Sequence, residues 1–179
     1  MKKRKLTLAA LTVYFFSSIM LFTSCDKDDF LNEIKIDNPN VSLLGTWNFG
    51  DVKTNMTVDG ESYKSYLETT VGLSEKEAEE VVSKMEKDYK VDGYITFKED
   101  GTFVQNFKEG EPQWGKWAVN TNDQITLTVK GDNQLLTIVK LNDELLQVYG
   151  IEDRKQDLNN DNKEDLLKVE ITNTLLKSK

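Results

Sequence analysis

Short segments of alternating apolar and polar residues, separated by turn residues, fill the chain from residue 93 onward. Asp100-Gly101 is a strong signal for a tight hairpin, and Asn142-Asp143 marks another turn. Strands joined by such turns pair antiparallel, so the pattern predicts a mostly β fold, either a barrel or a sandwich. The expected strands cover residues 41–48, 93–98, 102–108, 114–120, 124–129, 134–141, 144–150 and 167–172.

One stretch between the first two expected strands has helical rather than strand periodicity. Ser74 and Glu77 form a capping box, in which each side chain bonds the other residue's backbone N–H. Apolar residues then recur at helical spacing at Ala78, Val81, Val82, Met85 and Tyr89. We therefore expect a helix over about 75–90 and a shorter one over about 63–70. The apolar stripe either packs on the strands as a plug or flank, or forms a lid over an open barrel mouth.

Two Gly-x-Trp tripeptides lie in expected strands, Gly45-Thr46-Trp47 in the first strand and Gly115-Lys116-Trp117 in a middle one. With the hairpin at 97–103 they resemble the lipocalin-like (calycin-type) domains of bacterial lipoproteins, over residues 43–150. The resemblance implies an eight-stranded antiparallel lipocalin-like barrel with a helical insertion between strands 1 and 2, at about 61–90.

The same resemblance assigns a role to the first tripeptide. It implies that Trp47 packs at the barrel floor, where Gly45 admits a close backbone approach. It also implies an arginine from the last strand stacked on this tryptophan. The one arginine after the N-terminal segment is Arg154, which we expect in a loop, so the sequence offers no candidate for that stacking partner.

The N-terminal segment follows the three-part plan of a secretory signal. Residues 1–5 are basic, residues 6–22 carry no charge, and Ser24 precedes Cys25. A small residue before a cysteine at the cut site is typical of a lipoprotein. We therefore predict a signal peptide over 1–24, acylation of Cys25, an acidic tether over 25–40 and the barrel domain over 41–179. A plain secretory signal and a single membrane anchor are the alternatives.

The residues after the cysteine indicate a location. Lys27, Asp28 and Asp29 resemble the export signal of surface lipoproteins of the Bacteroidota type. The predicted location is the outer membrane, lipid-anchored and at the cell surface. Because an acidic segment is also what any solvated linker looks like, the periplasmic face is the alternative.

Composition excludes several function classes. The chain has no histidine and one cysteine, so Ser–His and Cys–His catalysis and sites for zinc-like metals are not expected. Residues 1–24 carry four of the 23 basic residues and none of the 31 acids, which leaves residues 25–179 with a net charge of −12. Such a chain repels nucleic acid. We expect neither an enzyme nor a nucleic-acid-binding protein.

An acidic segment near the C-terminus resembles the calcium loops of dockerin and EF-hand type. Its candidate ligands are Asp157, Asn159, Asp161, the backbone carbonyl of Lys163, and Asp165. The acid usual at position 12 is replaced by Lys168, which predicts weak binding. The alternative is a solvated acidic hairpin loop, and no other cofactor is expected.

These features predict a membrane-anchored binding module for a small apolar ligand or a protein partner. The alternatives are an envelope accessory protein with a filled barrel, and an inhibitor of extracellular hydrolases. Large side chains are candidates to fill a small barrel completely, namely Phe97, Phe103, Phe107, Trp114 and Trp117.

Overall fold

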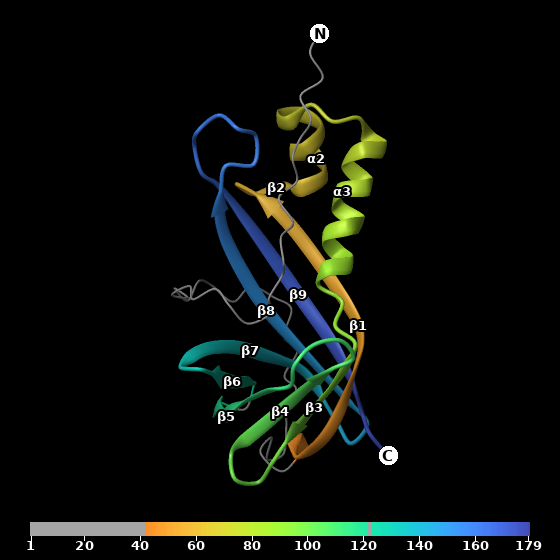
Figure 1. Cartoon of the computed structure of the whole chain (residues 1–179), viewed down its shortest axis with the longest axis vertical. Coiled ribbons are helices and arrows are strands. Elements are labelled where there is room, and N and C mark those ends of the chain that lie inside the picture. Colours follow the sequence, from red (N-terminus) through yellow and green to blue (C-terminus); the bar gives the residue numbers. More distant parts are fainter. Residues whose placement is uncertain (1–41, 122) are drawn as a thin grey trace.

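A computed structural model describes residues 42–121 and 123–179 (Figure 1). The strands are β1 Gly45–Val58, β2 Glu61–Ser62, β3 Gly93–Phe97, β4 Thr102–Phe107, β5 Gln113–Thr121, β6 Gln124–Val129, β7 Asp132–Leu141, β8 Leu145–Gln156 and β9 Asp165–Lys177. The helices are α2 Tyr63–Tyr66, the π-helix η1 Leu67–Val71 and α3 Glu75–Asp88. All three helices lie between β1 and β3.

The strands close into an antiparallel barrel. Neighbouring strands pair in the order β2-β1-β3-β4-β5-β6-β7-β8-β9, and β1 also pairs with β9. Eight strands therefore form the closed ring, and the two-residue β2 is an addition beside β1. This confirms the predicted eight-stranded lipocalin-like barrel with a helical insertion. Residues 42–179 contain all the strands of the closed barrel and both apolar clusters described below, so this part of the chain should fold on its own.

Aromatic side chains fill one end of the barrel. The ring of Phe97 lies 6.3 Å from that of Phe103 and 5.4 Å from that of Trp117, between centroids. Gly115 pairs with Phe103, and a Cβ there would lie 2.6 Å from the Phe103 ring. A glycine is therefore needed where the ring covers the strand. The expectation that Trp114 lies in the interior is wrong. Its side chain faces outward with 65% of its surface exposed, because the adjacent residue Gly115 faces inward.

The barrel floor is closed by a contact between the two ends of the domain. Trp47 is fully buried, and its Nε1 donates to the Leu43 carbonyl at 2.7 Å. The Lys177 ammonium lies 4.3 Å from the centre of the Trp47 ring and donates to the carbonyls of Ser42 and Leu44. A lysine of the last strand thus occupies the place where the resemblance implies an arginine. The expectation that Arg154 lies in a loop is wrong, since it lies in β8.

Three strands continue beyond the barrel and form an arm, defined as residues 51–58 of β1, 150–156 of β8 and 165–172 of β9. Figure 1 shows these strands rising away from β3–β7 toward the helices. Within the arm Met56 pairs with Val169 and Val58 with Leu167, so their side chains share one face. All four are buried. The arm makes β1, β8 and β9 much longer than the sequence predicted.

The helices cover the apolar face of the arm. A second apolar cluster joins this face to Tyr63, Tyr66, Leu67, Ala78 and Tyr89, with Val81, Val82 and Met85 of α3 packed against it. The capping box of α3 is formed as predicted, with the Ser74 and Glu77 side chains each bonding the other residue's backbone N–H. The helix α3 therefore packs on the side of the strands and does not form a lid over the barrel mouth.

A polar group joins the end of α3 to the arm. The Tyr89 hydroxyl donates to Glu152 Oε2 at 3.3 Å, and Arg154 Nε donates to Glu152 Oε1 at 2.6 Å. The Arg154 guanidinium also lies 5.7 Å from the centre of the Tyr89 ring. Burial raises the pKa of Tyr89, so this hydroxyl stays a hydrogen-bond donor at neutral pH. These contacts fix the position of the helix on the strands.

We predict that Lys177→Met lowers the free energy of unfolding by about 2 kcal/mol, because the Trp47 ring loses its cation and two backbone carbonyls lose a donor. Lys177→Arg should keep most of the stability, since a guanidinium supplies both interactions. Urea unfolding measures the difference. Lys168→Met, which removes only the partly exposed pair with Glu170, is the matched control. A loss in Lys177→Met no larger than in this control would contradict the prediction.

Candidate functional site

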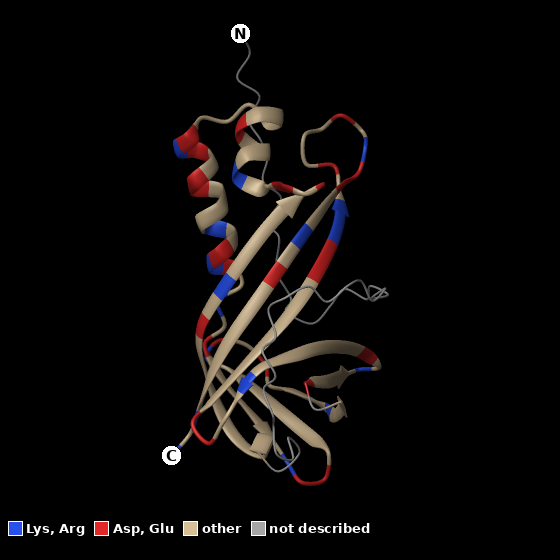
Figure 2. Ribbon diagram, turned by 180° about the vertical axis from the view of Figure 1, so that it is seen from behind, with Lys and Arg blue, Asp and Glu red and all other residues tan. Residues whose placement is uncertain are grey.

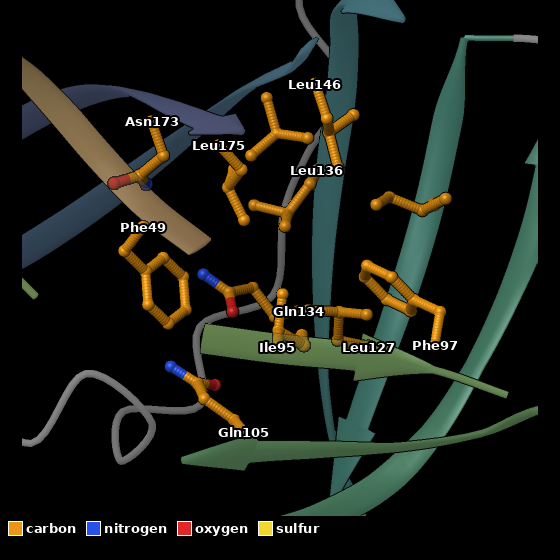
Figure 3. Close-up of a pocket in the computed structure, with 12 residues that line it drawn as sticks. Phe49, Ile95, Phe97, Gln105, Leu127, Gln134, Leu136, Leu146, Asn173 and Leu175 are labelled. Carbon is orange, nitrogen blue, oxygen red and sulfur yellow. The ribbon is translucent and has the colours of Figure 1, made fainter. Parts of the chain in front are cut away.

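A small cavity lies inside the barrel, beyond the aromatic cluster (Figure 3). Its volume is about 40 Å³, which is room for roughly three water molecules. Nine lining side chains are apolar, and they come from six of the eight barrel strands: Phe49, Ile95, Phe97, Ile125, Leu127, Leu136, Leu146, Val148 and Leu175. None of the lining residues belongs to α2, η1 or α3, so the helices do not cover this cavity.

The remaining lining residues are three carboxamides, Gln105 of β4, Gln134 of β7 and Asn173 of β9. Gln105 is only 2% exposed, and within the described part of the chain its side chain forms no hydrogen bond. Gln134 and Asn173 are half-buried. Figure 3 shows all three on the side of the cavity where Phe49 lies. The cavity therefore combines an apolar wall with neutral polar groups, and it contains no charged side chain.

A fourth carboxamide lies beside these. Gln113 is the direct cross-strand partner of Gln105 on β5, so both side chains point to the interior. Its Oε1 is buried and has no hydrogen-bond partner among the described residues. A buried amide next to a half-buried one, both with hydrogen-bonding capacity left unused, is costly in a protein interior.

The sequence contains a signal for these residues that our reading of it missed. Gln105 shares the strand face of Phe103, Gln134 that of Leu136, and Asn173 that of Leu175. A polar residue in register with buried apolar ones points to the interior. Detecting this required knowing which face of each strand is buried, and bulges change that face along β1, β5 and β7.

Comparison with known families agrees with this geometry. The sequence model of the lipocalin-like domain matches residues 43–148. The chain belongs to this family. A comparison with curated proteins found no match. A lipocalin-like barrel is typically a binding fold rather than a catalytic one, and it fits a module that binds small hydrophobic ligands.

The predicted calcium loop joins β8 and β9, and its polar side chains bond their own backbone. Asp157 accepts from the N–H groups of Asp161 and Asn162, at 3.1 and 2.9 Å. Asn159 accepts from the Asp161 N–H at 2.9 Å, and Asp161 accepts from the Lys163 N–H at 2.8 Å. Asn160 and Asn162 have positive φ, which asparagine tolerates. These bonds hold the loop in a curled conformation.

The fifth candidate ligand is used differently. Asp165 is buried, and its Oδ2 accepts from the Leu158 N–H at 2.8 Å across the base of the loop. Among the described residues, no group of three acidic, histidine or cysteine side chains is arranged to hold a metal ion. Calcium binding stays a prediction.

The predicted lipidation site Cys25 and the export signal at Lys27, Asp28 and Asp29 lie outside the described residues. Within residues 42–121 and 123–179, no helix has both the length and the apolarity that a membrane crossing demands.

We predict that Gln105→Leu raises the free energy of unfolding by about 1 kcal/mol, because it removes a buried amide that has no protein partner. Chemical unfolding of both proteins measures the change. The matched control is Gln147→Leu on the outer face of β8, which loses a 3.1 Å bond to Thr174 Oγ1 and should not stabilise the protein. A clear loss of stability in Gln105→Leu would assign this glutamine a structural role instead.

We predict that Asp157→Ala lowers the melting temperature by roughly 2 °C even in a chelator, because two loop N–H groups lose their acceptor. If the loop also binds calcium, millimolar calcium should raise the melting temperature of the wild type by mass action, and Asp157→Ala should lose that rise. Differential scanning calorimetry with calcium or chelator measures both effects. A wild-type melting temperature indifferent to calcium would contradict the calcium prediction alone.

Proposed function

We propose that this protein is a lipid-anchored, surface-exposed binding module whose barrel holds a small, predominantly apolar ligand. The observation that carries the proposal is the cavity, whose wall is apolar except for one buried and two half-buried carboxamides without protein partners. Sites of this composition are typical of small-molecule recognition, in which a few polar groups orient a mostly apolar ligand.

The anchor rests on the N-terminal sequence. A basic start, an uncharged stretch and Ser24-Cys25 favour cleavage before Cys25 and acylation of its thiol. Lys27, Asp28 and Asp29 favour export to the cell surface. The predicted tether, residues 25–40, would reach about 55 Å if fully extended, which is long enough to hold the barrel clear of the membrane.

One observation favours a second function, an envelope accessory protein with a filled barrel. The aromatic cluster occupies one end of the interior, and about 40 Å³ remains. This is far below the several hundred Å³ of most ligand sites. The first proposal therefore requires a very small ligand, or one that inserts only part of its length.

The two functions are distinguished by filling the cavity. We expect native mass spectrometry of the protein from its native host to detect a bound small molecule, and Leu136→Phe to abolish it because the new ring occupies the cavity. The control is Leu135→Phe, the adjacent residue, which is 37% exposed and faces outward. Melting curves must show that Leu136→Phe remains folded, because overpacking costs about 1–3 kcal/mol. Absence of any ligand from the wild type would favour the filled barrel.

We predict that a fatty-acid analogue fed to the native host labels the wild type and not Cys25→Ala, since only the thiolate forms the thioether to the diacylglyceryl group. Replacing Lys27, Asp28 and Asp29 by alanine should leave labelling intact but protect the protein from protease added to whole cells. Equal labelling of wild type and Cys25→Ala would refute the anchor. Protease resistance of the wild type would place the protein on the periplasmic face.

A further inference from the structure

We propose that the cavity selects a neutral group that both donates and accepts hydrogen bonds, such as the carboxamide or hydroxyl end of a small apolar molecule, and rejects carboxylates and ammonium groups. This inference rests on the proposed ligand-binding function and specifies its ligand. It starts from the composition of the polar lining, which consists of Gln105, Gln134 and Asn173 and nothing else.

The polar lining residues offer both hydrogen-bond donors and hydrogen-bond acceptors. Each carboxamide carries an oxygen that accepts and an NH₂ group that donates two hydrogen bonds. Within the described residues none of these three side chains forms a hydrogen bond with the protein. A ligand group with one donor and one acceptor satisfies an oxygen and an NH₂ at once, which a group that only accepts or only donates does not.

Charge is excluded by the surroundings of the cavity. A carboxylate entering it would lose its water and find no cation among the twelve lining residues. Lys177 is occupied at the floor by Trp47 and two carbonyls. An ammonium would likewise find no carboxylate. The net charge of −12 over residues 25–179 of the chain adds a long-range repulsion of anions. Figure 2 shows its acidic residues concentrated on α3, the arm and the loops, while the strands around the cavity are mostly uncharged.

The size of the cavity limits what enters. The half-buried lining residues Phe49, Gln134 and Asn173 mark the side nearest solvent, and the buried Gln105 lies on this same side. Space for roughly three waters accommodates a group of about three to five non-hydrogen atoms. The cavity therefore takes one end of a ligand, whose polar group contacts Gln105 and whose remaining part lies against the Phe49 ring.

Propionamide and propionate test this selection, because they have nearly the same shape and differ in an NH₂ group against a charged oxygen. The protein is the chain from residue 25 with Cys25→Ser, labelled with ¹⁵N and ¹³C. We expect propionamide to shift the side-chain NH₂ signals of Gln105, Gln134 and Asn173 with a millimolar dissociation constant at pH 7. Propionate should bind at least tenfold more weakly.

Xenon serves as an apolar probe that reports access to the cavity without polar contacts. It should shift the methyl signals of Leu136 and Val148 in the wild type and in Gln105→Leu. Propionamide should lose at least fivefold in affinity in Gln105→Leu and in Gln134→Leu, but not in the outward-facing control Gln147→Leu.

The outcomes separate this inference from the proposed function. If propionate binds as tightly as propionamide, or if both cavity variants bind propionamide like the wild type, the selection for a neutral group is overturned while the site itself stands. If neither xenon nor propionamide perturbs the cavity residues, both the selection and the proposed ligand-binding function are overturned.

Discussion

Pairing between β1 and β9 is the interaction on which both halves of the molecule depend. At one end Trp47 pairs with Lys177, and at the other Val58 pairs with Leu167. The first part of this ladder closes the barrel, which removes the free edges that β1 and β9 would otherwise expose. The second part builds the arm on which the helices pack. The floor contact of Lys177 with Trp47 and the helical cluster therefore lie at opposite ends of one strand pair.

A bulge in β1 joins the two halves. Between Phe49 and Val52 the strand gains one residue relative to β9, next to Gly50, where a Cβ would lie 2.9 Å from the Thr174 carbonyl oxygen. The extra residue reverses which positions of β1 face inward. Odd-numbered residues face inward before the bulge, and even-numbered residues do so after it. Phe49 lines the cavity just before the bulge, and Asn173 lines it from the opposite strand, paired with Val52. The bulge thus positions two of the three residues nearest solvent.

The same bulge explains why the sequence predicted the barrel but not the arm. The hairpin at Asp100-Gly101 and the capping box at Ser74 depend on local chemistry, and both are where the sequence puts them. In residues 49–58 the apolar residues move from odd to even positions at the bulge. The strict alternation that indicates a strand is therefore interrupted, and the sequence does not predict that β1 continues. The role of Lys177 was missed for another reason. Its stacking on Trp47 depends on where β9 ends, and the predicted strand ended at residue 172.

The sequence did not reveal the carboxamides, because their inward orientation follows only from the pairing register of the strands. Their placement favours a ligand-binding barrel over a filled one. A barrel selected for stability alone gains by placing leucine at position 105, since a buried amide without a partner loses its bonds to water and receives nothing in return.

The second apolar cluster gives the helices a structural role that is separate from the cavity. Val81, Val82 and Met85 pack on the arm, and no helical residue lines the interior. The cavity therefore does not depend on the position of α3, and its half-buried lining residues Phe49 and Asn173 lie at the β1 bulge. The cavity wall is apolar except for three amides, and one aromatic ring lies on its side nearest solvent. In the proposed function such a site selects ligands by their charge and size rather than by the movement of a lid.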